Sequence, residues 1–260
     1  MTQTNQTESL LPNDHQIWQA SLQWHPAPEQ QQQFQSLYAG ILQGNQQMNL
    51  TRITEPTEFW EKHLWDSLSG VAPWLQPPVS RPEWATKRST ATVTVIDIGT
   101  GAGFPGLPAA IALPHWQVTL LDSTQKKIRF LQELIQEQRL STVRAIADRA
   151  EFLAHQLSHR EQYDLALVRA VGPAAACAEY ALPLLKVGGI AVLYRGQWTE
   201  AESQALAQVA PKLGGSLLDE QAWQTPLTHG TRHCIYLHKR TTTREAFPRS
   251  AGIPTKQPLV

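Results

Sequence analysis

The spacing of apolar positions changes near residue 90 of this 260-residue chain. From about residue 12 to 75, apolar side chains recur every three or four positions, as Phe34, Leu37 and Ile41 do, and this is the period of an amphipathic helix. Beyond residue 90, short runs rich in β-branched residues alternate with helical stretches. Strict alternation of strands and helices is typical of a parallel sheet covered by helices on both faces. The pattern therefore predicts an α/β protein preceded by a small helical region.

Between these two parts, the stretch "QPPVSRPEWATKRSTA" is rich in proline, serine and charge, which favours a linker or an exposed insertion. The predicted strands are residues 93–98, 117–122, 142–147, 163–168, 190–195 and 232–238, and the predicted helices are 105–112, 124–138, 149–157, 174–185 and 199–211. We divide the chain into a helical appendage (1–75), the linker or insertion (76–91), a Rossmann-like domain (92–240) and a basic C-terminal tail (241–260).

Composition narrows the class of protein. The chain is 42% hydrophobic, enough for one sizeable core, and it contains neither a signal-peptide pattern nor an apolar run long enough to span a membrane. Two cysteines, Cys177 and Cys234, are too few for a disulfide framework and lack the spacing of a zinc site. We expect a cytoplasmic protein that binds no metal and no membrane.

Charge is uneven although the formal net charge is zero. Residues 1–60 carry one arginine against five acids, whereas residues 239–260 carry five basic residues against one acid. A basic tail favours a polyanion-binding segment, and a solvated terminus is the alternative interpretation.

The strand predicted at 93–98 runs into the glycine-rich stretch "DIGTGAGFPG". Ligands of open α/β sheets bind beyond the carboxyl ends of the strands, and glycine lets the backbone approach a ligand closely. Residues 101–106 literally match the dinucleotide fingerprint GxGxxG, which would indicate NAD(P). Asp97, two residues before the first glycine, instead suits the cationic end of S-adenosylmethionine and opposes a pyrophosphate. A tight turn that binds no ligand is the third possibility.

Two further strand ends bring carboxylates to the same edge of the sheet. Asp122 lies at the end of the predicted strand in "VTLLDST". It can accept hydrogen bonds from both hydroxyls of a ribose, or it can cap the next helix. The following strand ends with "IADRAEF", where Ala150 and Glu151 are candidates to contact an adenine and Asp148 is a candidate helix cap.

These motifs occur together and in order: "VIDIGTGAGFPGLPAAIALP", "VTLLDSTQKKIRFLQELIQE", "YDLALVRAV" and, near the C-terminus, "FPRSAGIPTKQPL". In this combination, and with "NLTRITEPTEFWEKHLWDSL" upstream, the chain resembles the bacterial 16S rRNA guanine-N7 methyltransferase family, RsmG, also called glucose-inhibited division protein B. The resemblance covers about residues 35–260. Arg195 departs from it, because many members have lysine there.

The resemblance implies a class I S-adenosylmethionine-dependent methyltransferase, with a Rossmann-like, mostly parallel seven-stranded sheet, that methylates N7 of a guanine in the 530 loop of 16S rRNA, position 527 in the family's name. It implies 16S rRNA or the small ribosomal subunit as partner, and we expect a monomer. Cofactor-binding residues are expected at Asp97, Gly99, Gly101, Gly103, Phe104, Asp122, Ser123, Thr124, Ala150, Glu151 and Arg169.

Guanine N7 carries a lone pair and no proton, so its methylation needs positioning rather than a general base. Arg169 and Arg195, at the ends of two predicted strands, are the candidate catalytic residues, in a positioning role only. RNA phosphates are expected to contact Lys126, Lys127, Arg129, Arg244, Arg249 and Lys256.

Two other functions fit parts of the pattern. An NAD(P)-binding oxidoreductase would use the literal GxGxxG, and a ribosome-binding protein without catalytic activity would retain only the methyltransferase fold. His63 and Asp66, which share a helix face, are expected to join the appendage to the main domain through a packing network.

Overall fold

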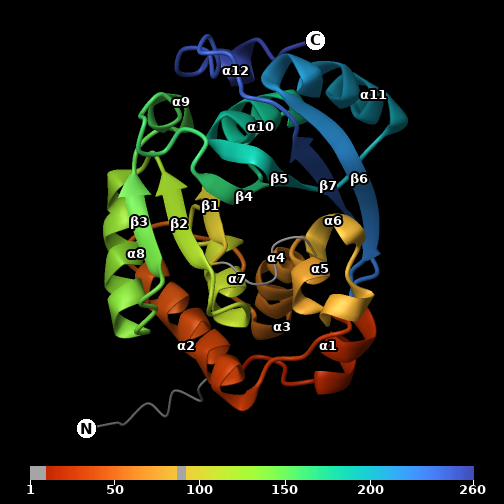
Figure 1. Ribbon diagram of the computed structural model, residues 1–260. Helices are drawn as coiled ribbons and strands as arrows, with labels where there is room; N and C mark the ends of the chain where they lie inside the picture. The colour runs from red at the N-terminus through yellow and green to blue at the C-terminus, as the bar shows by residue number, and fades with distance from the viewer. Residues whose placement is uncertain (1–9, 87–91) are drawn as a thin grey trace, which may run out of the picture.

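The computed structural model describes residues 10–86 and 92–260, and a seven-stranded sheet forms its centre (Figure 1). The strand order is β3-β2-β1-β4-β5-β7-β6. The parallel strands are β1 (Thr94–Ile98), β2 (Gln117–Asp122), β3 (Val143–Ala147), β4 (Tyr163–Arg169) and β5 (Leu185–Arg195). The strand β7 (Thr231–Lys239) lies antiparallel between β5 and β6 (Gly215–Gln224). The predicted mostly parallel seven-stranded sheet is thus confirmed.

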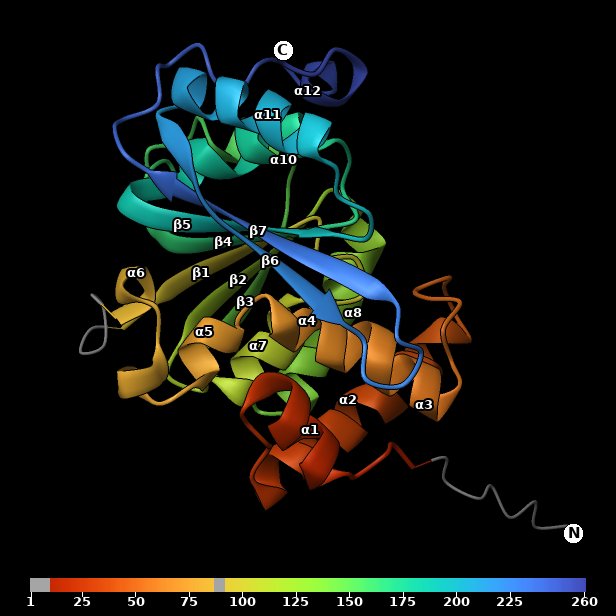
Figure 2. The same ribbon diagram turned by 90° about the vertical axis from the view of Figure 1, so that its right-hand side faces the viewer.

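Successive side chains of a strand enter two different hydrophobic clusters, because side chains alternate between the two faces of a sheet. In β1, Val95 belongs to one cluster, whereas Ile96 and Ile98, which share the opposite face, belong to the other. The first face is covered by α7 (Gly106–Ala112), α8 (Gln125–Glu137) and the N-terminal helices. The second face is covered by α9 (Ala150–Leu153), α10 (Ala174–Ala181) and α11 (Glu200–Val209), and Figure 2 shows α10 and α11 on this side of the sheet. Helices therefore cover both faces, as predicted.

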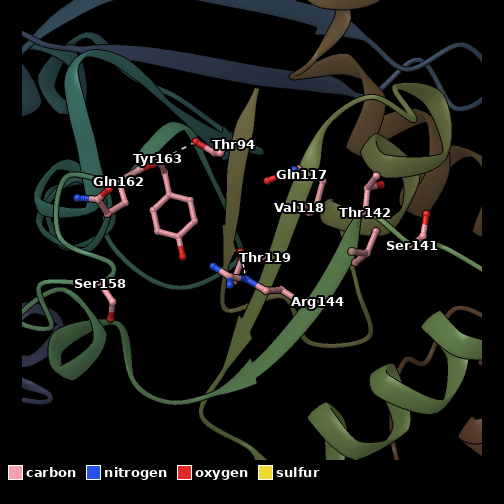
Figure 3. A pocket seen from close by; sticks show the side chains of 11 residues that line it. Thr94, Gln117, Val118, Thr119, Ser141, Thr142, Arg144, Ser158, Gln162 and Tyr163 are labelled. Atoms are coloured by element: carbon pink, nitrogen blue, oxygen red, sulfur yellow. Dashed lines mark hydrogen bonds between the residues drawn. The ribbon is translucent and has the colours of Figure 1, made fainter. Parts of the chain in front are cut away.

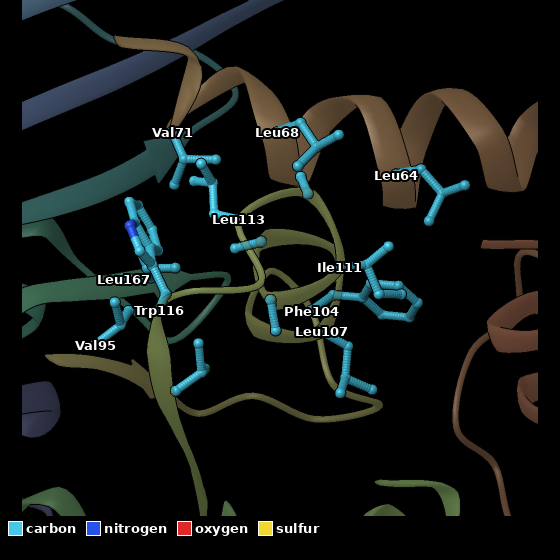
Figure 4. Packing of buried hydrophobic residues seen from close by; sticks show 14 of the residues in the cluster. Leu64, Leu68, Val71, Val95, Phe104, Leu107, Ile111, Leu113, Trp116 and Leu167 are labelled. Atoms are coloured by element: carbon cyan, nitrogen blue, oxygen red, sulfur yellow. The ribbon is translucent and has the colours of Figure 1, made fainter. Parts of the chain in front are cut away.

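The N-terminal region packs directly on the sheet domain. It consists of α1 (His15–Leu22), α2 (Pro28–Asn45), a continuous helical segment made of α3 (Pro56–Phe59), η1 (Trp60–Trp65) and α4 (Asp66–Ser69), and then α5 (Ala72–Leu75). Figure 4 shows Leu64, Leu68 and Val71 of this region beside Phe104, Ile111, Leu113 and Trp116 of the sheet domain. One hydrophobic cluster joins the two parts, and the division at residue 75 stays a prediction.

The segment predicted as a linker is partly helical. It contains η2 (Pro78–Ser80) and α6 (Glu83–Thr86), while residues 87–91 lie outside the described part. The ring of Trp84 lies 5.6 Å from that of Trp74 and 4.9 Å from that of Tyr236. These contacts fasten residues 76–86 against β7.

The predicted elements differ clearly from the observed ones in three places, and the helices predicted at 174–185 and 199–211 end earlier, at Ala181 and Val209. The apolar pattern missed β6, an edge strand whose residues are mostly half-buried or exposed, so it lacks the buried run that marks a central strand. The helix predicted at 149–157 ends as α9 at Leu153. The strand β5 begins at Leu185 rather than residue 190, because a register shift opposite Tyr163 and Leu165 accommodates the intervening "KVGG".

The C-terminal segment, which includes α12 (Ile253–Lys256), folds back on the second face of the sheet (Figure 1). The buried carboxylate of Glu179 in α10 accepts hydrogen bonds from the Arg249 backbone N–H and from its guanidinium, the shortest to Nη2 at 2.7 Å. A buried carboxylate needs such partners, so this contact anchors the segment. Across the described ranges, no helix combines the length and apolar character needed to span a bilayer.

Candidate functional site: two cavities at the carboxyl edge of the sheet

The glycine-rich loop after β1 has three residues with positive φ: Gly99 (+73°), Gly101 (+59°) and Gly103 (+97°). A Cβ at Gly99 would lie 2.7 Å from Val171, and one at Gly103 would lie 2.4 Å from Leu107, so both positions need glycine for internal packing. At Gly101 the nearest atom would be 4.0 Å away. Gly101 is therefore the glycine whose backbone is open to a ligand.

Asp97 lies beneath this loop and is fully buried. Its Oδ2 accepts hydrogen bonds from Thr100 Oγ1 at 2.6 Å and from the Gly106 backbone N–H at 2.8 Å. Its Oδ1 is buried and has no hydrogen-bond partner among the described residues. Burial raises the pKa of the Asp97 carboxyl to about 6, against the opposing effect of the two hydrogen bonds. The carboxylate thus fixes the loop with one oxygen and leaves the other unsatisfied.

Asp122 closes the loop from the end of β2. Its Oδ2 accepts from the Gly101 backbone N–H at 3.0 Å, and its Oδ1 accepts from the Thr124 backbone N–H at 2.8 Å. Asp122 and Ser123 line a cavity together with Gly99 and Val171. The alternative of Asp122 as helix cap is wrong, since the N-cap residue of α8 is Thr124; Asp122 fixes the turn before it, and its carboxylate borders the cavity.

Ala150 and Glu151 line the same cavity from the start of α9. Glu151 is buried, and its Oε1 accepts from Arg149 Nη2 at 3.1 Å and from the Gly252 backbone N–H at 2.8 Å. These hydrogen bonds hold the pKa of Glu151 below its usual value against the effect of burial. The C-terminal segment therefore reaches the wall of this cavity, a contact that sequence reasoning missed.

A second cavity, of about 540 Å³, lies at the ends of β4 and β5. It adjoins the first, because Ala170 lines the second and the next residue, Val171, lines the first. Arg195 lines the second cavity, donates from Nη1 to the Gly172 carbonyl at 2.8 Å, and lies 3.4 Å from Glu202 through Nη2. Its Nε is buried without a partner among the described residues.

Arg169, which was expected among the cofactor-binding residues, lines the second cavity and not the first, and the N-terminal helical segment holds it there. Its Nη1 donates to Asp66 Oδ2 at 2.7 Å and to the Lys62 carbonyl at 3.0 Å. Its Nη2 lies 3.5 Å from His63 Nδ1. The expected network between His63, Asp66 and the main domain exists, and it ends on Arg169.

Phe104 connects this network to the glycine-rich loop. Its ring is stacked on that of His63, with centroids 4.4 Å apart and planes inclined by 7°, and the Arg169 guanidinium lies 5.7 Å from the Phe104 centroid. Burial, together with the nearby charge of Arg169, lowers the pKa of His63 to about 3, so this imidazole is neutral. Phe104 is buried and does not line the first cavity; its ring contacts are with His63 and Phe59 of the N-terminal region and with Arg169.

The basic residues expected to contact RNA are in different surroundings. Lys126 and Arg129 are exposed on α8, and Lys127 lies 4.0 Å from Asp122. Arg244 and Lys256 are exposed, whereas Arg249 is engaged by Glu179. Sequence reasoning missed Arg232 of β7, which lines the second cavity and has no nearby motif that could have marked it.

A third cavity, of about 380 Å³, lies at the opposite edge, where the parallel strands begin (Figure 3). Thr94, Gln117 and Arg144 line it, and Arg144 Nε donates to Thr119 Oγ1 at 3.0 Å. None of the predicted site residues borders this cavity. Within the described ranges, no group of three histidine, cysteine or acidic side chains is arranged to hold a metal ion.

The strand order with its antiparallel β7 and the ligand cavity beside the glycine-rich loop define a class I S-adenosylmethionine-dependent methyltransferase. The family model described as "GidB: rRNA small subunit methyltransferase G" matches residues 30–227. The chain belongs to this family, so the predicted fold class and family are confirmed, and with them the predicted methyltransferase class and S-adenosylmethionine as cofactor.

Curated relatives match along nearly their whole length. The ribosomal RNA small subunit methyltransferase G of Trichormus variabilis is 53% identical over 251 residues, which is 96% of this chain and 99% of that one. The protein of the same name from Synechococcus elongatus is 53% identical over 246 residues, 95% of this chain and 97% of the other. A solved 16S rRNA (adenine(1408)-N(1))-methyltransferase from Catenulisporales acidiphilia is 15% identical, with 65% of this chain and 94% of that chain covered and a TM-score of 0.49.

The residues of the first cavity fit the cofactor. In the glycine-rich loop beside this cavity, the buried Asp97 has an unsatisfied Oδ1, an anion of the kind that a cationic amino-acid end requires, although neither Asp97 nor Gly101 lines the cavity itself. The carboxylate of Asp122 borders the same cavity and can accept from hydroxyls.

Proposed function

We propose that this protein transfers the methyl group of S-adenosylmethionine to N7 of a guanine in the 530 loop of 16S rRNA, either in free rRNA or in the small ribosomal subunit. In this proposal it acts as a cytoplasmic monomer. The names of its curated relatives, ribosomal RNA small subunit methyltransferase G, support an rRNA substrate.

The observation that carries the choice of a guanine N7 acceptor is the pairing of the charges around the second cavity. Its two carboxylates are both engaged: Asp66 accepts from Arg169, and Glu202 lies beside Arg195 and caps α11 by accepting from the Thr199 backbone N–H. Both carboxylates therefore already have donors within the protein, and neither is a free partner for a proton of the acceptor base. The cavity is thus suited to a nucleophile that has no proton to lose, and N7 is such a nucleophile.

The residues of the chain then act by position and charge. When bound, S-adenosylmethionine supplies an electrophilic methyl group. Asp122 and Glu151, which line the first cavity, and Asp97 and Gly101 of the adjoining loop are proposed to orient the cofactor, and Arg169 and Arg195 to orient the acceptor nucleotide in the second cavity. Guanidinium groups hold negatively charged or planar groups in fixed orientation, and such alignment lowers the barrier of a bimolecular reaction.

The test is methylation of small subunits isolated from cells that lack the N7 modification. The purified protein is incubated with these subunits and tritiated S-adenosylmethionine, and labelled rRNA is mapped by aniline cleavage at N7-methylguanine. Cleavage at a guanine of the 530 loop supports the proposal. If the cofactor binds but no label enters rRNA, the ribosome-binding alternative is favoured, and label at another base would reassign the target.

A further inference from the structure

Asp66 is placed between two arginines that come from distant parts of the chain. Its Oδ2 accepts from Arg169 of β4 at 2.7 Å, and its Oδ1 lies 3.5 Å from Arg232 Nε of β7. All three residues line the second cavity. The side chains of Asp66 and Arg169 are only 13% and 15% exposed, so water screens their interaction little.

His63 restrains Arg169 from a second direction. Because a guanidinium only donates hydrogen bonds, His63 Nδ1 must accept from Arg169, and the imidazole proton then resides on Nε2, which donates to Thr51 Oγ1 at 2.8 Å. Stacking on Phe104 fixes the plane of the imidazole. The Arg169 guanidinium is therefore fixed by Asp66, by His63 and by the Lys62 carbonyl.

Such fixation contributes little to the free energy of folding, because the cost of desolvating a partly buried ion pair is about as large as the electrostatic attraction between its charges. It has a large value for orientation. Arginine is the side chain best suited to hold a phosphodiester, and three arginines against two carboxylates leave the cavity wall with excess positive charge.

We propose that Asp66 is a positioning residue, which holds Arg169 and Arg232 in place to bind phosphodiester groups of the single-stranded RNA segment that carries the methyl acceptor. The inference rests on the proposed function and adds to it an RNA-phosphate subsite made of Asp66, Arg169 and Arg232. Asp66 acts through the arginines and does not touch the reacting atoms.

The test compares Asp66→Asn, Arg169→Ala and the double variant in kcat, in affinity for a 530-loop oligonucleotide and in affinity for S-adenosylmethionine. Asp66→Asn should lower kcat about a hundredfold because the guanidiniums lose their alignment. Affinity for RNA should stay within about threefold of the wild type, since the cavity gains positive charge, and cofactor affinity should not change. The loss in the double variant should be clearly smaller than the product of the two single losses, because Asp66 acts in part through Arg169, and what remains is its effect on Arg232.

Asp164→Asn is the matched control. Asp164 is at the start of the same strand, β4, and lies 3.1 Å from Lys186, so its replacement removes a comparable ion pair at the opposite edge of the sheet. Its kcat should equal that of the wild type. If Asp66→Asn fails to fold, Asp66→Glu retains the charge but displaces the arginines, and it should lower kcat while RNA affinity is unchanged.

Two results would overturn the proposal. The first is a loss of kcat in the double variant equal to the product of the two single losses. The second is a joint loss of cofactor affinity, RNA affinity and thermal stability in Asp66→Asn. A readout independent of catalysis separates the inference from the proposed function. NMR signals of the Arg169 and Arg232 guanidiniums, assigned with alanine variants, should shift when the oligonucleotide is added to the wild type. Unmoved signals overturn the phosphate subsite, whereas shifted signals in a protein that leaves the guanine unmethylated overturn only the proposed function.

Discussion

The two cavities at the carboxyl edge of the sheet are built in different ways. The first is made mainly at consecutive strand ends, where Asp97 bonds to Thr100 and Gly106 and Asp122 bonds to Thr124, and only its Glu151 wall reaches the distant Gly252. The second is made by residues brought together from far apart, since Asp66 and Arg169 are separated by 103 positions along the chain. A cavity made of local turns keeps its shape through the backbone, whereas the second depends on how the N-terminal helices dock on the sheet. Each can therefore be disturbed without the other.

The substitution Asp122→Ala is expected to give the largest difference between the effects on the two cavities, because it should weaken cofactor binding and leave RNA binding unchanged. The carboxylate fixes both Gly101 and Thr124, and hydrogen bonds to a charged group contribute about 1.5–3 kcal/mol each. The affinity for S-adenosylmethionine, measured by isothermal titration calorimetry, should fall at least about a hundredfold, while affinity for the oligonucleotide should be retained. Asp219→Ala is the control, because Asp219 bonds locally to Glu220 and Gln221 in the contacts described and does not line the first cavity. Equal effects of the two substitutions would remove Asp122 from the cofactor site.

The second prediction concerns the acid stability of the docked helices. The pKa of His63 is about 3 in the folded protein, below its value of about 6.5 in an unfolded chain, so on acidification the unfolded chain takes up a proton that the folded one does not. The stability contribution of neutral His63 is present above pH 6.5 and is lost as the pH falls toward 3. Between pH 7 and pH 5 this loss is about 2 kcal/mol.

His63→Gln should therefore make the free energy of unfolding, measured by urea titration, less dependent on pH in this interval. His115→Gln, which replaces an exposed histidine, should leave the dependence unchanged. An unaltered pH dependence in His63→Gln would show that the docking of the helices is not linked to the protonation of this imidazole.

The difference between contacts that are near in sequence and contacts that are distant in sequence also explains which features could be predicted from the sequence. The order of strands and helices and the residues around the first cavity follow from alternating apolar runs and from glycines directly after a strand, which are local signals. The edge strand β6 escaped because its side chains are mostly half-buried or exposed, so it lacks the buried apolar run of a central strand. Arg232 escaped because only the pairing of β7 with β5 and the docking of Asp66 bring it to the cavity. The role of Asp97 was predicted as ligand contact alone, whereas its Oδ2 fixes the loop.

A smaller effect is expected from Arg232→Ala. This side chain is 33% exposed at the cavity, and the loss of one phosphate contact should weaken oligonucleotide binding about tenfold, with cofactor affinity unchanged. Arg240→Ala provides the comparison, since Arg240 follows the other end of β7 and donates to Ser216 Oγ. Fluorescence anisotropy of a labelled oligonucleotide measures both. Weakening by Arg240→Ala to the same degree would mean that overall charge, and not the cavity, governs binding.

The smallest effect is expected on the surface beside the first cavity. Lys126 is exposed and Lys127 half-exposed at the start of α8, and the alternative to an RNA contact is that these lysines form a solvated helix face. If they contact phosphates, replacing both by glutamate should weaken oligonucleotide binding only a few-fold at physiological salt, and it should reduce the dependence of log Kd on log salt by about one unit per lost contact. Arg139→Glu with Lys212→Glu changes the net charge equally at exposed positions away from the carboxyl edge. If both double substitutions change the dependence of log Kd on log salt equally, Lys126 and Lys127 do not contact phosphates specifically. The second cavity, with its fixed arginines, would then be the main source of RNA affinity.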